Sequence, residues 1–186
     1  MFTAFFEKYP EYSIIEKPTD NLITEYAEML PKEIIQFWKD YGFGTFMKGY
    51  LRIINPDDYI QTLLETYDYA DREIPIAVTA FGDIICWQGE AFNFINYRFN
   101  YSQIIGVGEF DWFLNMDLTE DYYVNSKLKA DLFNDAKNRL GELSFDECYG
   151  YVPLLALGGS EKAENLKKMN TKVHLDLITQ LVGTIE

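Results

Sequence analysis

The sequence predicts an α+β fold, in which an antiparallel sheet meander in the middle of the chain is flanked by N-terminal and C-terminal helices. The first observation is the helical spacing of apolar residues within 22–41 and again within 174–183. The second is a series of short β-rich segments between residues 74 and 107, separated by turn residues. Helices followed by strands and then by helices again are typical of α+β folds with antiparallel pairing.

The N-terminal third predicts three helices and one strand. Apolar residues recur at helical spacing over 22–30 until Pro31 interrupts them, and the pattern returns over 32–41. Gly42 then stands where a left-handed C-terminal cap is expected. Residues 50–54 predict a short strand, and Pro56 fits the first turn of a third helix.

The middle of the chain predicts the sheet. Residues 74–80 and 84–87 are β-rich runs separated by Gly82-Asp83, which predicts the tight turn of an antiparallel hairpin. Residues 92–99, with aromatic side chains available to both faces, predict a further strand, and residues 103–107 predict a fourth.

The rest of the chain returns to helices. Residues 109–117 are predicted to be helical, and Leu128, Leu132, Ala136 and Leu140 mark one amphipathic helix that Gly141 ends. An apolar stripe over 177–182 indicates a C-terminal helix. Because no linker rich in Pro, Gly or Ser and no internal repeat occurs, we expect only a soft boundary near residue 124 between two parts that pack together.

Two series of short motifs resemble a known family. One comprises an acidic pair, Gly150, which is expected in a turn, a strand-like apolar segment and a double glycine within 146–160, then 165–168 and 174–183. The other comprises 30–44, 49–59 and 74–83. In this order they resemble a GAD-like domain followed by the C-terminal domain of type VI secretion immunity proteins. The resemblance implies a bacterial immunity protein that binds and neutralises a cognate secreted toxin. Because family members of this kind are associated with nuclease toxins, it also implies a toxin of the nuclease type.

The same resemblance divides the chain into two parts. It assigns residues 1–123 to the GAD-like α+β part and residues 124–186 to the immunity-protein C-terminal part, packed together as one compact unit. The charge is distributed unevenly between them: residues 1–123 carry 21 acidic and 8 basic side chains, whereas residues 124–186 carry 9 and 8.

The net charge of −14 restricts the possible partners. It argues against non-specific nucleic-acid binding, because phosphates would be repelled. It favours a basic protein partner that long-range attraction steers towards the chain, so we expect a cognate basic toxin and no nucleic acid. The alternative is that the acidic surface only keeps the protein soluble.

Two acidic segments are candidates for the toxin-binding surface. Residues 57–73 contain six acids and one base, and residues 109–121 contain five acids and no base, interleaved with aromatic side chains. Rings flanked by carboxylates suit a protein interface, although the same pattern is produced by core aromatics with a solvated acidic outer face. The candidate residues are Asp57, Asp58, Asp68, Asp71, Glu73, Glu109, Asp111, Trp112, Asp117, Glu120 and Asp121.

The sequence contains no recognisable catalytic or metal-binding pattern. His174 is the single histidine, and Cys86 and Cys148 are isolated thiols without metal-ligand spacing. The carboxylate clusters lack the pattern of a calcium loop. We therefore expect no enzyme activity, no cofactor and no metal. Two alternatives stay open: a small-molecule-binding or regulatory module with an aromatic pocket along residues 92–101, and an enzyme of unrecognised type that uses carboxylates or Cys148.

The sequence also predicts where the protein is found. The N-terminus has no basic start and its apolar run is too short for a secretory signal, and no apolar run is long enough to span a bilayer. Unpaired thiols are typical of a reducing compartment. We expect a cytoplasmic protein without a membrane partner, and the oligomeric state is left open.

Overall fold

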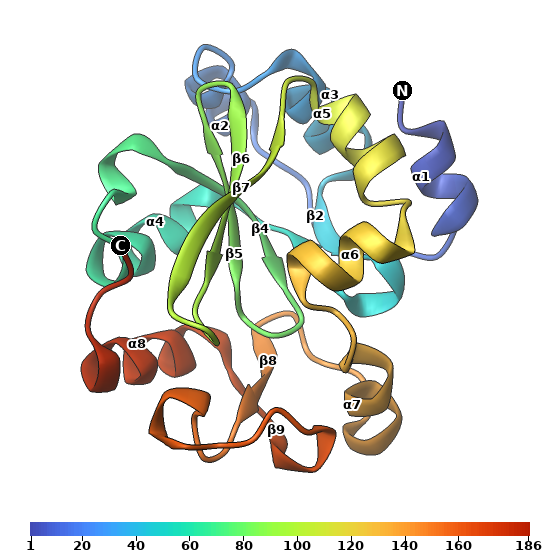
Figure 1. The fold of residues 1–186 in the computed structure, drawn as a ribbon. Helices are drawn as coiled ribbons and strands as arrows, with labels where there is room; N and C mark the ends of the chain where they lie inside the picture. Colours follow the sequence, from blue (N-terminus) through green and yellow to red (C-terminus); the bar gives the residue numbers. More distant parts are fainter.

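A seven-stranded antiparallel sheet forms the centre of the computed structural model, which describes all of residues 1–186 (Figure 1). The strands lie side by side in the order of the sequence, so the whole sheet is one meander. This arrangement confirms the predicted α+β fold. The strands are β1 (Ser13–Glu16), β2 (Phe43–Phe46), β3 (Leu51–Ile53), β4 (Ile74–Thr79), β5 (Ile84–Gln88), β6 (Ala91–Asn96) and β7 (Tyr101–Val107).

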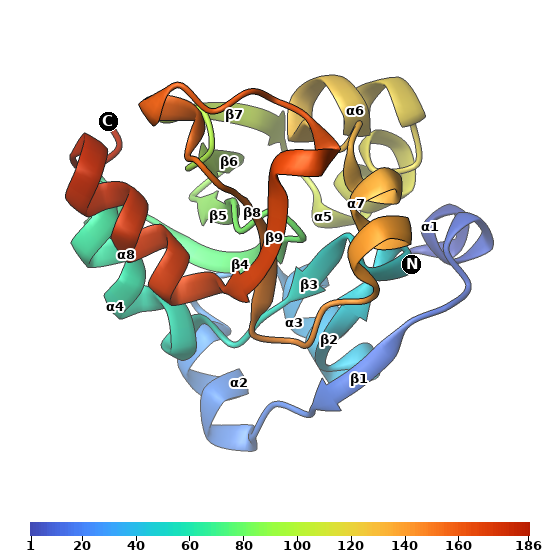
Figure 2. The ribbon, with the colours of Figure 1, turned by 90° about the horizontal axis from the view of Figure 1, so that it is seen from below.

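Helices cover both faces of this sheet, and a separate two-stranded hairpin lies at one end of it (Figures 1 and 2). None of the helices has both the length and the apolar character that crossing a bilayer requires. The helices are α1 (Thr3–Lys8), α2 (Asp20–Tyr26), α3 (Lys32–Tyr41), α4 (Pro56–Thr66), α5 (Phe110–Trp112), α6 (Asp121–Leu128), α7 (Phe133–Leu140) and α8 (Thr171–Val182), and the hairpin consists of β8 (Glu147–Tyr151) and β9 (Leu166–Asn170). Short helical turns are η1 (Met47–Gly49), η2 (Ala70–Arg72), η4 (Leu155–Leu157) and η5 (Ala163–Asn165), and the π-helical turn η3 (Phe113–Asp117) continues α5.

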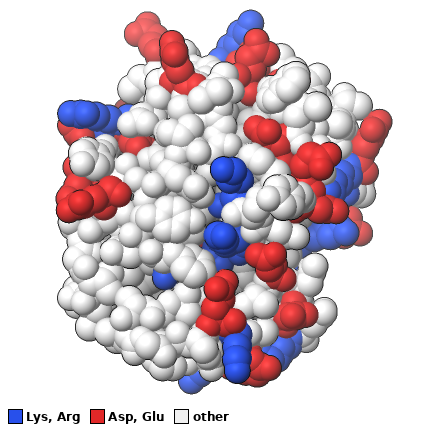
Figure 3. Space-filling model, viewed as in Figure 1, with Lys and Arg blue, Asp and Glu red and all other residues white.

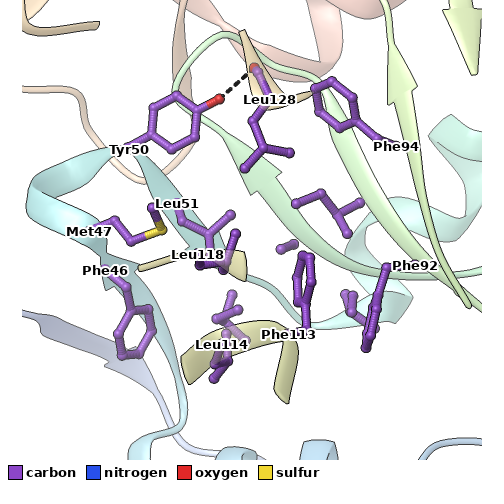
Figure 4. Packing of buried hydrophobic residues seen from close by; sticks show 14 of the residues in the cluster. Phe46, Met47, Tyr50, Leu51, Phe92, Phe94, Phe113, Leu114, Leu118 and Leu128 are labelled. Carbon is purple, nitrogen blue, oxygen red and sulfur yellow. Dashed lines mark hydrogen bonds between the residues drawn. The ribbon is translucent and has the colours of Figure 1, made fainter. Parts of the chain in front are cut away.

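The larger of two hydrophobic cores lies on one face of the sheet. It joins aromatic side chains of β2 and β6 to apolar side chains of α3, η3, α6 and α7. Figure 4 shows Leu114 and Phe113 of η3 facing the strands, and the Tyr50 hydroxyl donating to the Leu128 carbonyl. Phe113 stacks on Phe92, with ring centroids 4.3 Å apart. Aromatic side chains each bury a large area, so these rings contribute strongly to the larger core.

The smaller core lies on the opposite face, under α4 and α8. Tyr59 and Leu63 of α4 and Leu175 and Ile178 of α8 pack on residues of β4 to β6. The C-terminus is fixed there as well, because Ile185 pairs with Tyr67 in an isolated parallel bridge. Both helices begin with an asparagine side chain that accepts a hydrogen bond from the backbone of the first turn, as expected for a helix N-cap.

A buried ion pair joins the two turns at one end of the sheet. Asp83, between β4 and β5, is fully buried and accepts from Arg98, which follows β6, with 2.6 Å between Nη2 and Oδ2. Arg98 also donates to the carbonyls of Leu128 and Lys129, at the end of α6, and its guanidinium lies 4.2 Å from the centre of the Phe81 ring. The predicted hairpin turn at Gly82-Asp83 is confirmed, and Asp83 has a structural role in it.

The prediction of a single helix over residues 128–140 is wrong. The structure has two helices there, because α6 ends at Leu128 and Lys129 takes the left-handed conformation, with φ 56°. No glycine or proline marks this break. The carbonyls that α6 leaves free at its end are the ones to which Arg98 donates, so a distant side chain stabilises the break.

The turn predicted at Gly150 is also wrong, because Gly150 lies inside strand β8. A Cβ atom there would lie 2.5 Å from Nε2 of His174 and 2.5 Å from Sδ of Met169. Glycine is therefore required by the close packing of α8 on the strand and not by a turn. The apolar residues that follow form η4 and not a strand.

The N-terminal segment is tied to a segment near the middle of the chain. The first helix, α1, which the sequence did not indicate, lies against η3, and the backbone amides of Phe2 and Phe5 donate to the side chains of Asp111 and Asn115. Lys8 forms an ion pair with Asp121. The boundary near residue 124 stays a prediction, and these contacts show how closely the segments on its N-terminal side are joined.

The packing of α3 predicts a large effect of one substitution. Trp38 is fully buried, with the Phe43 ring 5.2 Å away and the Tyr26 ring 5.8 Å away. Trp38→Ala should lower the free energy of unfolding by about 3–5 kcal/mol, because it removes buried area and leaves a cavity. Urea unfolding followed by circular dichroism measures the change. Trp112→Ala is the matched control, since Trp112 is 59% exposed; equal losses in both variants would contradict the assignment of Trp38 to the core.

Candidate partner-binding surface and polar cleft

The two acidic segments predicted to bind a toxin lie on opposite sides of the sheet. Residues 57–73 form α4 and η2, which pack on the face of the smaller core. Residues 109–121 form α5, η3 and the start of α6, on the face of the larger core. In Figure 3 the acidic side chains are scattered over the visible face together with basic side chains, and they form no single acidic patch there. One flat partner surface cannot cover both segments.

The first acidic segment is only partly available to a partner. Asp58, Asp68 and Asp71 are exposed, whereas Asp57 accepts a hydrogen bond from the Tyr26 hydroxyl at 2.7 Å. Glu73 is buried, at 3% exposed, and accepts from Nδ2 of Asn93 and from the Tyr67 hydroxyl. Its burial raises the pKa of the Glu73 carboxyl. We therefore leave Glu73 out of any binding surface.

The second acidic segment combines exposed acids with exposed large side chains. Phe110, Phe113 and Leu114 are in the core, but Trp112 is 59% exposed and Tyr122 is 83% exposed. Of the acids, Asp111 holds the backbone of Phe2, Asp121 pairs with Lys8, and Asp117 is half-buried, which raises its pKa. The side chains left free for a partner define what we call the Trp112 surface: Glu109, Trp112, Met116, Glu120 and Tyr122.

The candidate nucleophile and base are both buried and are not activated. Burial raises the pKa of Cys148 to about 12, and it lowers the pKa of His174 to about 4. At neutral pH the thiol therefore keeps its proton and the imidazole is uncharged. Cys86 is fully buried, and its thiol pKa is raised well above the ordinary value, with burial as the main cause. The structure brings together no group of three or more His, Cys, Asp or Glu side chains that could hold a metal ion.

The aromatic strand residues do not form a ligand pocket. Phe92 and Phe94 are fully buried in the larger core, and Tyr97 is buried in the smaller one, where its hydroxyl lies 2.6 Å from that of Thr66. The hollow that Tyr97 lines has a volume of about 10 Å³. That volume is below what a small-molecule ligand needs.

A larger polar cleft lies elsewhere, between β1–β3 and the segment that joins α7 to β8. Its volume is about 230 Å³. Figure 2 shows this segment running alongside β2 and β3. Ser13, Thr45 and Arg52 are neighbours in register across three strands, and all three line the cleft. No local sequence pattern indicates this cleft, because its walls come from residues 11–52 and 133–149.

Arg52, at the floor of this cleft, is 2% exposed and joins the sheet to the C-terminal hairpin. Its Nη1 donates to the carbonyls of Phe145, at 2.8 Å, and Glu147, and its Nη2 donates to the carbonyl of Thr79 at 2.7 Å. Its Nε has no hydrogen-bond partner. Burial lowers the pKa of the guanidinium.

The comparisons with known proteins identify the family. The model of the GAD-like domain matches residues 1–98, and the model of the C-terminal domain of the type VI secretion immunity protein Tdi1 matches residues 108–182. The chain therefore belongs to the GAD-like family and carries the immunity-protein domain behind it, as the resemblance implied. The two matches support a role in immunity to a type VI secretion toxin.

A solved structure supports the fold. The crystal structure of Atu4351 from Agrobacterium tumefaciens has a TM-score of 0.77 with this chain at 18% identity, and the similarity covers 97% of this chain and 89% of that one. At this identity the likeness concerns the fold alone. No curated protein sequence matches the chain.

The burial of His174 predicts a pH dependence of stability. The pKa of about 4 in the folded protein lies below the ordinary value of 6.5, so the unfolded chain binds a proton first as the pH falls. Stability should therefore be unaffected by this group above pH 6.5 and decline as the pH falls from there towards 4, by up to about 3 kcal/mol. His174→Gln should show a smaller decline in urea unfolding over this range; identical pH profiles would contradict the assignment.

Proposed function

We propose that this protein binds and neutralises a cognate secreted toxin, of the nuclease type. The single observation that carries the proposal is the pair of family matches, which place a type VI secretion immunity domain over residues 108–182 behind a GAD-like domain. A binding role also agrees with the chemistry of the site, since Cys148 and His174 are buried and their pKa values are shifted away from nucleophilic or basic activity.

We infer that the toxin docks on the Trp112 surface. Tryptophan, tyrosine and methionine are enriched in protein interfaces, and buried aromatic anchors carry most of the binding energy. Trp112 and Tyr122 are the two most exposed aromatic side chains of the chain, at 59% and 83%. The N-cap positions Glu109 and Glu120 make no side-chain capping bond, so both carboxylates are free to face a partner.

The charge of the chain supports a basic partner. The net charge is −14, and the Trp112 surface contains two carboxylates and no base. A nuclease needs a basic groove for its substrate, and an acidic inhibitor of matching shape can occupy such a groove. The acids would then act mainly on the rate of encounter, whereas Trp112 would act mainly on the rate of dissociation.

The first test measures protection and binding together. Cells that produce the candidate toxin, identified by capture of the bound protein from the native host, should survive when the wild-type chain is co-produced. Trp112→Ala should weaken the affinity for the purified toxin at least tenfold, through faster dissociation, because a desolvated anchor is lost. Surface plasmon resonance measures both rates.

The matched control is Tyr69→Ala, since Tyr69 is 46% exposed on the other side of the sheet. It should leave both rates unchanged. Loss of protection and of binding in the Tyr69 variant, with none in the Trp112 variant, would place the toxin on the α4 side. Absence of protection by the wild-type chain against that toxin would refute the proposed pairing.

The second test separates the two acidic segments. The double variant Glu109→Gln with Glu120→Gln should lower the association rate and flatten its dependence on salt, because screening acts over about 8 Å at physiological ionic strength. Asp68→Asn with Asp71→Asn removes the same charge from the opposite side and should change the rate less. Association kinetics across a salt series compare the two double variants. An equal effect of both would contradict a specific role of Glu109 and Glu120 and would indicate that only the net charge of the chain matters.

A further inference from the structure

Arg52 carries a buried charge without a counter-ion. Its hydrogen bonds go to backbone carbonyls and to the Thr171 hydroxyl, and it takes part in none of the four ion pairs of the protein. Arg98, the other buried arginine, is paired with Asp83. A buried ion that lacks a charged partner is costly, so the environment of Arg52 is suited to an anion that this chain does not itself supply.

The cleft next to Arg52 gathers two further cations. Lys48 extends from η1, and Lys137 of α7 donates to the Lys48 carbonyl at 2.7 Å, which holds the two residues together. Lys48 itself takes part in no ion pair. The two carboxylates that line the cleft are Glu142, which lies 3.3 Å from Lys137, and Glu11, which is exposed. The lining therefore has three positive and two negative side chains, in a chain of net charge −14.

The remaining lining suits a small polar ligand. Ser13, Thr45 and Ser144 offer hydroxyl groups, and Tyr12 and Tyr149 offer aromatic rings. The volume of about 230 Å³ is less than that of a site for a drug-sized molecule, commonly about 300–1,000 Å³, but it accommodates a phosphate ion or a short carboxylic acid. The cleft also spans the two family-matched regions, and junctions of this kind commonly hold ligands.

We propose that this cleft binds a small free oxyanion, a carboxylate or phosphate compound, between Lys48, Lys137 and the buried Arg52. The anion supplies the negative charge that Arg52 lacks, and Lys48 contributes the solvent-exposed contact. This site is separate from the Trp112 surface, so the inference does not depend on the proposed toxin.

The test uses the whole purified chain with inorganic phosphate and with citrate as probes. Each should raise the thermal unfolding midpoint in a saturable manner, beyond the effect of sodium chloride at the same ionic strength, because a ligand of the folded state stabilises it. In NMR titrations the amides of Thr45 and Gly49 should shift with the same dissociation constant. Binding of phosphate alone or of citrate alone would identify the class of oxyanion.

Lys48→Asn is the test variant, and Lys129→Asn is its matched control. Both lysines have left-handed backbone conformations, with φ 59° and 56°, and asparagine tolerates this conformation well. Lys129 lies outside the cleft. The Lys48 variant should bind the probe about tenfold more weakly, and the control should bind it like the wild type. No saturable effect in the wild type beyond that of chloride, or equal binding in both variants, would overturn the proposal.

Discussion

The ion pair between Arg98 and Asp83 is the interaction on which the rest of the fold depends. It is buried on both sides, so breaking it would leave an unpaired charge in the core, which commonly costs about 3–5 kcal/mol. The same guanidinium holds the turn between β4 and β5 and the end of α6, and it lies on the Phe81 ring. Through Arg98 the sheet, the larger core and the break between α6 and α7 are positioned together.

Much of the fold was predictable because local patterns coincide with tertiary demands. The helix over residues 32–41 and the Gly82-Asp83 hairpin are found as expected, since apolar spacing and a turn glycine agree there with what the core requires. The wrong predictions fall where a side chain distant in sequence determines the local backbone structure. Lys129 turns left-handed at a break that Arg98 stabilises, and Gly150 is small because His174 lies against it. Neither partner can be inferred from the residues near the break or the strand.

The candidate site was predictable only in composition. The sequence showed which segments are rich in acids and rings, but burial separates them: Phe110 and Phe113 pack inward, and Trp112, between them, does not. Glu73 was grouped with its acidic neighbours, whereas Asn93 and Tyr67 hold it inside. The polar cleft had no local signal at all, because neighbouring strands align Ser13, Thr45 and Arg52 from three separate stretches of chain. Pairing across a sheet carries that information, and a linear pattern does not.

The contacts of α1 with η3 and of Ile185 with Tyr67 have a consequence for biosynthesis. Phe2 and Phe5 obtain their hydrogen-bond partners only after residues 111–115 have been synthesised, and Tyr67 pairs with a residue next to the C-terminus. A ribosome synthesises the chain from its N-terminus onwards, so the contacts of the first helix form only after more than a hundred later residues have been added, and the bridge between Tyr67 and Ile185 waits for a similar length of chain. Both contacts are therefore late steps of folding, and a chain interrupted before residue 111 would lack both of them.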